Sequence, residues 1–501
     1  MKRINFNLRI EHLWGLIVLA GIFIFMNTHP IRPHDFWWHI AVGREILSTG
    51  HIPLTDIYSY TEAGQAYSSY QIYWLMETIL YAIYKLGGPA LVVFIQSLMI
   101  TSAYAVLFMI CKGVSNSWRM AAMGTLFAAA LGLNDWNVRP QSITFLLASL
   151  ILLAIYAYRK KPGWGWLAVF PACMLVWANS HGTFVIGLVL VAIWWGQELW
   201  TALIQWIQHR SSIQLKAVLA PGIAFVTSCL ACLVNPRGMG IISYVRSLTS
   251  NSAVQNLVTE WAPPTFTTLM GAIFFAGLII GGILLVIDFK KLSFYQVVIY
   301  LGFGILSLQT SRGIVWFGIV MAPIVAEQLA GLVEHYKKAA VQPMVQGGSR
   351  IINMVFVALI LLMSVITLPW FKSALPLPSD KAGLISSETP VEATAFLLEQ
   401  NPPGRIFNAM SFGSYLIWAA YPEYQVFADS RIELFSEKVW LDYFTISNAE
   451  PGWEEKLTSY GVNSLMLSVS DQEPLIEAVE ATDDWQLLYR DQVAAIYVRG
   501  N

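Results

Sequence analysis

The chain is poor in charge. Only 12% of its 501 residues are Asp, Glu, Lys or Arg, and 56% are hydrophobic, whereas an ordinary soluble domain has about 25% charged residues. This composition excludes a soluble enzyme and favours a protein embedded in a membrane.

Several other signals are scarce. Of the four cysteines, Cys229 and Cys232 form a C-x-x-C, but without the second pair or the histidines that a zinc site requires. No long basic run with interleaved aromatic residues is present, so nucleic acid is not expected as a partner. A glycine-rich phosphate fingerprint is also missing from the C-terminal part, which argues against a nucleotide-binding domain there.

The formal net charge of -1 combines two unlike parts. Residues 1–372 carry 23 Lys and Arg against 12 Asp and Glu, a net charge of +11. Residues 373–501 carry 7 against 19, a net charge of -12. We therefore predict a transmembrane domain over 1–372 and a separate acidic domain over 373–501.

The first part contains eleven stretches apolar enough to cross a bilayer, which needs about 20 residues. These stretches are 12–27, 89–111, 118–133, 141–158, 164–179, 183–207, 217–234, 267–287, 293–309, 313–333 and 351–371. The first is not followed by a small-residue cleavage site, so it is not expected to be a removed signal peptide. The sequence predicts a polytopic α-helical membrane protein with about eleven transmembrane helices.

The positions of Lys and Arg predict the orientation, because cytoplasmic loops collect these residues. With a cytoplasmic N-terminus, 15 of them fall on inner segments, including Lys2, Arg3 and Arg9, and 8 fall outside. Eleven spans then place the acidic domain on the extracytoplasmic side.

The first outer loop, residues 28–88, is expected to contain two interfacial helices. Thr49 and Gly50 end the first helix, and Gly87-Gly88-Pro89 ends a second over roughly 70–86. The first carries an apolar stripe at helical spacing, formed by Phe36, Trp37, Ile40, Ala41 and Leu47. Such a helix would lie in the interface with its tryptophan pair at the depth of the lipid headgroups.

Unusual polar residues gather on the predicted outer side. Asp35 and His39 share one face of the first interfacial helix, and Glu77 is the only acid of the second, where it either reaches water or belongs to a site. The other outer loops add Asp135, Arg139, Gln141, Asn179, His181, Asn235, Arg237, Glu260, Trp261, Gln309 and Arg312. Hydrocarbon penalises ionisable groups by a few kcal/mol or more, so we expect these loops to share one outward cavity.

Such a cavity suits a lipid-carried phosphate. Guanidinium groups bind phosphate oxygens bidentately and keep their charge when partly desolvated. A neighbouring carboxylate can accept a proton from an attacking hydroxyl. Together they would perform group transfer from a lipid phosphate to an acceptor.

Four motifs carry a resemblance to a known family: DFWWHIAVGREILSTGHIPLTDIYSYT from Asp35, WANSHGTFVIG from Trp177, VNPRG from Val234 and FADSR from Phe427. The sequence resembles the GT-C superfamily of polytopic membrane glycosyltransferases, and more narrowly an uncharacterised bacterial group with an HDFWWH-type first outer loop. The resemblance implies inverting transfer of a sugar from a polyprenyl-phosphate donor to a glycan, lipid or protein acceptor. The reaction would take place at the outer face of the bacterial cytoplasmic (inner) membrane.

The resemblance also implies roles for individual residues. Asp35 would be the general base. The donor phosphate would bind to Arg139, Arg237 and Arg312. The substrates would be positioned by His39, Glu77, Asn179, His181 and Glu260.

No metal is expected to be required, because arginines alone can neutralise a monophosphate leaving group. In many relatives an acidic residue neighbours the first-loop acid, whereas Phe36 follows Asp35 here. A divalent metal held by His34, Asp35 and His39 is the alternative.

Two other functions remain open. A non-catalytic subunit of a larger assembly would have its cleft filled by side chains or lipid tails. A transporter of lipid-linked sugars would show broken helices at mid-membrane and a two-half repeat, and no convincing repeat is present.

The acidic part reads as a small α/β domain that serves as a lid or binds the acceptor. Strands are predicted at the start of 404–422 and at 423–431, 462–470 and 494–500, with helices at the end of 404–422 and at about 390–400, 433–446, 452–460 and 472–480. Asp429 and Arg431 follow a predicted strand, where a binding residue is usual. The alternative is an ion pair that fixes a loop.

Overall fold

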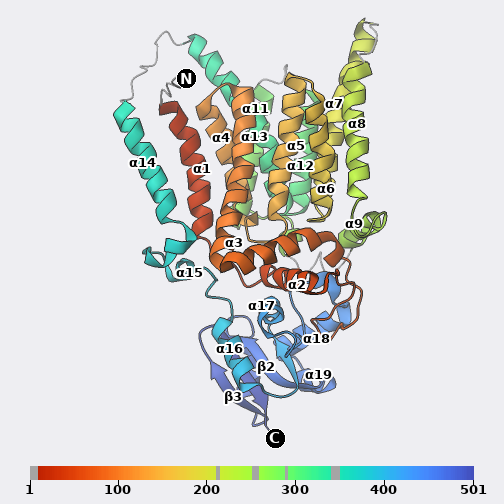
Figure 1. The fold of residues 1–501 in the computed structure, drawn as a ribbon, viewed down its shortest axis with the longest axis vertical. Coiled ribbons are helices and arrows are strands. Elements are labelled where there is room, and N and C mark those ends of the chain that lie inside the picture. The colour runs from red at the N-terminus through yellow and green to blue at the C-terminus, as the bar shows by residue number, and fades with distance from the viewer. Residues whose placement is uncertain (1–9, 210–214, 251–258, 288–291, 340–349, 501) are drawn as a thin grey trace.

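The computed structural model describes residues 10–209, 215–250, 259–287, 292–339 and 350–500. Lys2, Arg3 and Arg9, on which the predicted orientation partly rests, lie outside these ranges. The protein has three layers: a helical bundle, a middle layer from the first outer loop, and a C-terminal α/β domain (Figure 1). The start of α1 and the C-terminal domain lie at opposite ends of the bundle.

The bundle consists of apolar helices. They are α1 (Ile10–Thr28), the second part of α3 (Tyr70–Ser115), α4 (Trp118–Gly132), α5 (Ser142–Lys160), α6 (Trp164–Ala178), α7 (Phe184–His209), α8 (Leu215–Cys232), α11 (Leu269–Ile287), α12 (Phe294–Gln309), α13 (Gly313–Ala339) and α14 (Arg350–Ile366). Seven of them are long and apolar enough to cross a membrane, namely α1, α3, α5, α7, α8, α11 and α13; α6, α12 and α14 are shorter apolar helices. The protein is thus a multi-pass helical membrane protein, and the count of eleven spans stays a prediction.

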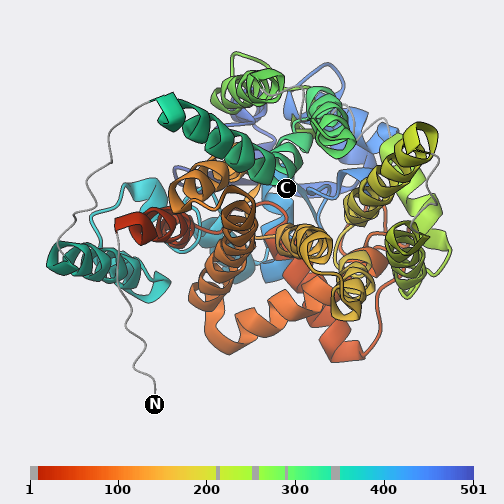
Figure 2. The same ribbon diagram turned by 90° about the horizontal axis from the view of Figure 1, so that it is seen from above.

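The bundle packs through small residues inside and exposes large apolar ones outside. A Cβ atom on Gly124 of α4 would lie 2.6 Å from the carbonyl oxygen of Ala322 in α13, so these helices approach closely, as is usual in membranes. At the edge of the bundle α14 lies beside α1 (Figures 1 and 2). Ile351 and Phe356 of α14 are exposed, as expected of a surface that faces lipid.

Short helices lie at the end of the bundle that faces the C-terminal domain. These are η1 (Leu133–Asp135), α9 (Gly240–Ser250) and η2 (Thr259–Trp261).

The middle layer contains α2 (Phe36–Thr49) and the first part of α3. α3 is broken where the sequence predicts it, because Gly88 has a φ of 60° that few residues other than glycine adopt. The part before the break crosses the end of the bundle and the part after it enters the bundle (Figure 1). Gly50 ends α2 with a φ of 74°, as expected.

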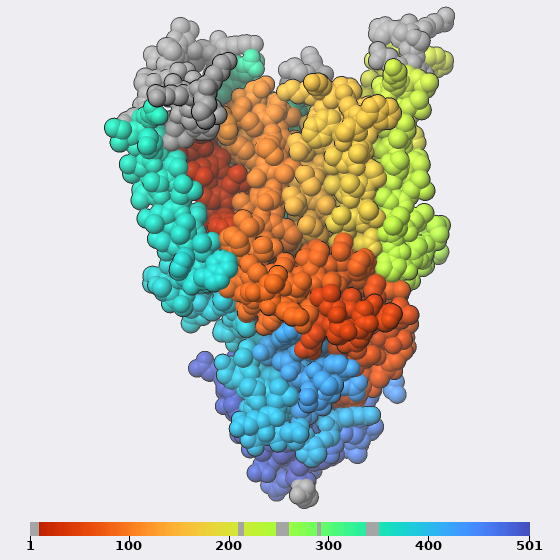
Figure 3. All heavy atoms as spheres, in the orientation of Figure 1, coloured from red at the N-terminus to blue at the C-terminus, as the bar shows by residue number. Residues whose placement is uncertain are grey.

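The tryptophan pair does not face the lipid headgroups directly but is buried in the protein. Trp37 and Trp38 are 0% and 3% exposed, because α2 is enclosed between α3 and α17 (Met410–Ala420) of the C-terminal domain. Leu47, at the far end of the stripe, is 52% exposed. Figure 3 shows the first-loop layer as a continuous band between the bundle and the C-terminal domain. The sequence could not show that this domain covers the helix.

The C-terminal domain is a mixed α/β fold, as predicted. Its sheet has the order β1-β2-β4-β3, with β1 (Arg405–Asn408) parallel to β2 (Val462–Ser468) and β4 (Ala494–Arg499) antiparallel to both β2 and β3 (Trp485–Arg490). β3 was not predicted. The helices are η4 (Pro369–Ala374), α15 (Ser379–Ala382), α16 (Val391–Gln400), α17, η5 (Ile432–Leu434), α18 (Glu437–Ser447), α19 (Trp453–Ser459) and α20 (Glu473–Glu480).

The strand predicted at 423–431 does not form. In this segment Val426 makes an isolated bridge with Ser59 of the first outer loop, and its backbone N–H donates to the carbonyl oxygen of Tyr58 at 3.0 Å. The apolar run there is buried at the junction of the two layers, which explains why it resembles a strand without joining the sheet.

The first outer loop and the C-terminal domain share one hydrophobic core. Trp38 and Tyr70 from the loop lie in the same buried cluster as Phe412 and Phe427 from the domain. A shared core of this kind argues against a mobile lid. The predicted boundary after residue 372 falls inside η4, between the last bundle helix and the first helix of the domain.

Candidate active site

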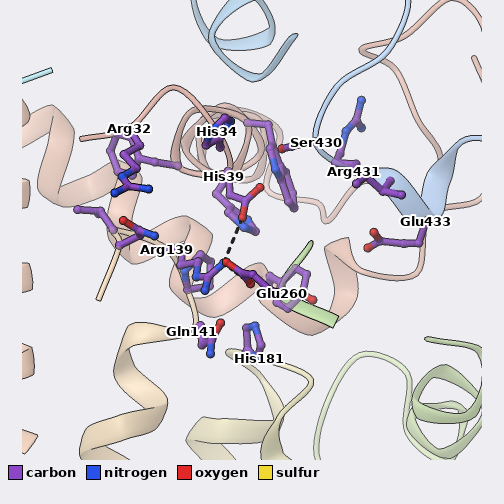
Figure 4. A pocket seen from close by; sticks show the side chains of 18 of the residues that line it. Arg32, His34, His39, Arg139, Gln141, His181, Glu260, Ser430, Arg431 and Glu433 are labelled. Atoms are coloured by element: carbon purple, nitrogen blue, oxygen red, sulfur yellow. Dashed lines mark hydrogen bonds and ion pairs between the residues drawn. The ribbon is translucent and has the colours of Figure 1, made fainter. Parts of the chain in front are cut away.

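A cavity of about 530 Å³ lies where the three layers meet (Figure 4). Most of its lining comes from the first outer loop, from the outer ends of the bundle helices and from residues 430–433 of the C-terminal domain. The predicted site residues that line it are His34, Asp35, His39, Arg139, His181, Glu260 and Arg312. The predicted shared cavity is therefore present for these residues.

Asp35 stands at the start of α2 and is available to the cavity. It occupies the N-cap position, but its side chain makes no capping hydrogen bond. The side chain is 32% exposed, and its Oδ2 lies 3.7 Å from Nη1 of Arg139. The carboxylate thus faces the cavity with a cation beside it.

Arg139 is buried among three carboxylates. Its Nη1 lies 3.3 Å from both carboxylate oxygens of Glu260, and its Nη2 lies 3.8 Å from Oδ1 of Asp135. Burial alone would lower the pKa of Arg139, but Glu260, Asp35 and Asp135 outweigh it and raise that pKa. Its Nε and Nη2 are buried and have no hydrogen-bond partner among the residues that the structure describes.

Glu260 joins Arg139 to the second cavity arginine. Arg312 donates from Nε to Oε2 of Glu260 at 2.8 Å and stacks over Trp261 at 5.5 Å from the ring centre. Burial opposes ionisation of Glu260, but Arg139 and Arg312 lower its pKa to about 2. For Asp135, burial dominates and raises its pKa to about 7, against the opposing effect of Arg139.

His39 and Glu77 form a buried pair at the cavity wall. His39 Nδ1 and Glu77 Oε1 are 2.8 Å apart, and Glu77 is fully buried behind the histidine. Burial lowers the pKa of His39 and raises that of Glu77, so burial disfavours the charged form of each group. The helices meet closely here, because a Cβ atom on Gly43 would lie 2.1 Å from the carbonyl oxygen of Glu77.

His181 enters the cavity from the loop between α6 and α7. Its ring packs against that of Tyr73 with the centres 5.2 Å apart. Burial lowers the pKa of His181, and Arg312 and Arg139 lower it further. The histidine is therefore neutral beside both cavity arginines.

Three predicted site residues do not line the cavity. Arg237 donates to Oε1 of Gln71 at 3.0 Å, and Asn179 accepts from Nε1 of Trp74 at 2.8 Å and donates to the carbonyl oxygen of Val234 at 2.7 Å. Glu77 reaches the cavity only through His39. These residues hold the walls in position.

The cavity also contains residues that the sequence did not single out. Arg32 lines it only three residues before Asp35, a proximity that could have identified it. Glu433 comes from the C-terminal domain and accepts hydrogen bonds from Tyr67 and Ser69 of the first outer loop at 2.7 and 3.0 Å. Arg431, which the sequence marked as a possible binding residue, lies two positions before Glu433 and also lines the cavity.

Within the described ranges, no three His, Cys, Asp or Glu side chains are arranged to hold a metal ion. A metal held by His34, Asp35 and His39 stays a prediction.

The fold consists of a bundle of membrane helices, a broken first-loop helix across one end of it and an α/β domain over a polar cavity. No family model matches the sequence, and no curated protein matches it.

Two solved structures share this fold. One is the arabinofuranosyltransferase AftD from Mycobacteria, with a TM-score of 0.58 and 12% identity over 97% of this chain. This chain spans only 41% of AftD. The other is ArnT from Cupriavidus metallidurans bound to undecaprenyl phosphate, with a TM-score of 0.50 and 13% identity over 97% of both chains.

Proposed function

We propose that this protein is a glycosyltransferase of the bacterial cytoplasmic membrane. It moves one sugar from a polyprenyl-phosphate donor to a cell-envelope acceptor at the outer face, with a cytoplasmic N-terminus and an extracytoplasmic C-terminal domain. The observation that carries the proposal is the meeting of Asp35, Arg139 and Arg312 in one cavity at the end of the membrane bundle. The shared fold of a neighbour bound to undecaprenyl phosphate supports a lipid-phosphate donor.

The reaction is a single displacement that inverts the anomeric carbon. The acceptor oxygen attacks this carbon while Asp35 takes the hydroxyl proton as general base. The bond from the carbon to the phosphate oxygen breaks, and its electron pair remains on the polyprenyl phosphate. Arg139 and Arg312 stabilise the charge that develops there, so no metal is required.

The remaining cavity residues orient these groups. Glu260 fixes Arg139 and Arg312 relative to one another, and His39, supported by Glu77, contacts the substrates. Asn179 acts indirectly by joining two outer loops. Arg237 has no part in phosphate binding, because it lies outside the cavity lining.

Two observations weigh against the alternative functions. Protein side chains leave the cavity unfilled, whereas they would fill it in a non-catalytic subunit whose cleft is closed by its own side chains. The break in α3 lies at the end of the bundle, whereas broken helices of transporters lie near mid-membrane.

The test is transfer of radiolabelled sugar from a polyprenyl-phosphate donor by the protein purified in nanodiscs. We expect the wild type to label an acceptor and Asp35→Asn to be at least about 100-fold slower, as expected for loss of a general base. Asp483→Asn, at an exposed site in the C-terminal domain, is the matched control and should behave as wild type.

Equal transfer by wild type and Asp35→Asn would exclude the role of Asp35. Absence of transfer with every donor, together with movement of the lipid-linked sugar across proteoliposomes, would favour the transporter.

A further inference from the structure

The motif WANSHGT joins three side chains by consecutive hydrogen bonds whose donors and acceptors can be assigned. Nε1 of Trp177 lies 3.2 Å from Oγ1 of Thr183, and an indole N–H can only donate. The Thr183 oxygen therefore accepts from the indole, and its own proton is free for the next partner. That partner is Nδ1 of His181, 3.0 Å away.

A second contact also identifies Nδ1 of His181 as a hydrogen-bond acceptor. The backbone N–H of Thr183 donates to Nδ1 of His181 at 3.2 Å. Nδ1 therefore accepts two hydrogen bonds and carries no proton. In a neutral imidazole the proton is then on Nε2. The hydrogen bonds that join Trp177, Thr183 and His181 therefore select one tautomer of His181.

The protonated edge of His181 is available to the cavity. The Nδ1 edge is occupied by Thr183, while the residue as a whole lines the cavity. Figure 4 shows the His181 ring near Gln141 and Glu260, and the charged groups that act on it are Arg312, Arg139 and Glu260. An N–H donor thus stands beside both arginines proposed to bind phosphate.

We propose that His181 is a phosphate-binding residue that donates a neutral hydrogen bond from Nε2 to a phosphate oxygen of the lipid-linked donor. The inference rests on the proposed function and specifies how its donor site is built. A neutral donor orients the phosphate without adding a third positive charge. This matters because the donor phosphodiester carries one negative charge and the released monoester up to two, so a third cation would hold the product more tightly than the donor.

The test uses two substitutions that separate the two ring nitrogens. In His181→Gln the amide nitrogen can reach the position of Nε2, whereas in His181→Asn it corresponds to Nδ1 and leaves no donor in the cavity. Binding of a polyprenyl-phosphate sugar to the protein in nanodiscs, without acceptor, is measured from pH 6 to 8. We expect about tenfold or greater weakening for His181→Asn, since the bond is made to a charged group, and less than about threefold for His181→Gln.

The tautomer has its own readout. Solid-state NMR of protein labelled with ¹⁵N-histidine, with the His181 signal identified by its loss in His181→Asn, should show a protonated Nε2 and an unprotonated Nδ1 at pH 7. Thr183→Val removes the hydroxyl and keeps the backbone N–H, so it should weaken donor binding less than His181→Asn.

The inference is overturned if His181→Asn binds the donor as the wild type does, or if His181 is doubly protonated at pH 7. It is also overturned if His181→Gln and His181→Asn weaken binding equally while both unfold at the wild-type temperature. If the wild type binds the donor through His181 but transfers no sugar, the proposed function fails and this inference stands.

Discussion

Two buried arginines line the same cavity but come from different regions of the protein and are held in different ways. Arg431, at the junction of the first outer loop with the C-terminal domain, is 1% exposed and donates to Asp429 through Nε at 2.9 Å and Nη2 at 2.6 Å. Its Nη1 donates to Asp56 at 2.5 Å and to the hydroxyl of Tyr70. Each of its three side-chain nitrogens has a partner.

Arg139, in the cavity, is also buried but is held more loosely. Its distances to carboxylate oxygens are 3.3 to 3.8 Å, and two of its carboxylate partners, Asp35 and Glu260, are partly exposed. A buried charge with all its hydrogen bonds made is a structural group, since breaking it leaves its partners unpaired. A charge held at longer distances beside a cavity is better suited to an incoming anion. The following predictions test this distinction, from the largest effect to the smallest.

Arg431→Met should destabilise the protein by roughly 3–5 kcal/mol, because Asp56 and Asp429 would remain buried without their cation. Thermal or denaturant unfolding in detergent measures this loss. The triple variant Arg431→Met, Asp56→Asn, Asp429→Asn removes the unpaired charges and should recover part of the stability. A loss below about 1 kcal/mol would mean that the junction does not depend on Arg431.

Arg139→Met should mainly affect transfer. We expect kcat/KM to fall by about 100-fold or more, the usual cost of removing a group that stabilises the developing charge. The melting temperature should change far less than in Arg431→Met, because Asp35 and Glu260 are partly exposed. A variant that unfolds as readily as Arg431→Met would remove the distinction between the two arginines.

Asp135 should make stability depend on pH. Its pKa of about 7 in the folded protein exceeds the unfolded value of about 3.9, so the folded state binds its proton more tightly. The stability gained from this tighter proton binding is fully present below about pH 4 and is lost as the pH rises through 7. Asp135→Asn should therefore be more stable than wild type at pH 8, by about 1 kcal/mol or more, and the gap should close toward pH 4. Unfolding experiments from pH 4 to 8 measure the difference in stability between Asp135→Asn and wild type. A difference that does not change with pH would contradict the burial of this carboxyl.

Arg237→Ala should have the smallest effect on transfer and stability. Like Arg139→Met, it removes one positive charge from the predicted outer side of the membrane. The residue lies outside the cavity lining, and its side chain donates to Gln71 and, at 3.4 Å, to the carbonyl oxygen of Gly240, so transfer should stay within about threefold and stability within about 1–2 kcal/mol. If transfer falls as far as in Arg139→Met, the phosphate is not where we place it.

Part of this architecture can be predicted from the sequence, because it depends on local patterns. The break at Gly88 and the end of α2 at Gly50 follow from glycine conformations. The meeting of Asp35, Arg139 and Arg312 follows from membrane topology, since loops on one side of a short bundle have little room to separate.

The rest depends on contacts between distant residues. Asp56 and Arg431 are 375 positions apart, and no local pattern shows that their docking would bury Trp37 and Trp38. The segment around Val426 has the composition of a strand, but its partner is the first outer loop. Arg139 and Arg237 both look like outer-loop phosphate ligands, and only the fold shows which one enters the cavity.

The central claim is that the cavity between Arg139 and Arg312 holds the phosphate of a lipid carrier. A cryo-EM map of the protein in nanodiscs with added polyprenyl phosphate tests it most directly. Our account predicts phosphate density within hydrogen-bond distance of Arg312 and His181, next to Arg139, with the cavity in front of Asp35 left for the sugar. Phosphate density beside Arg237, or at any site away from this cavity, would contradict it.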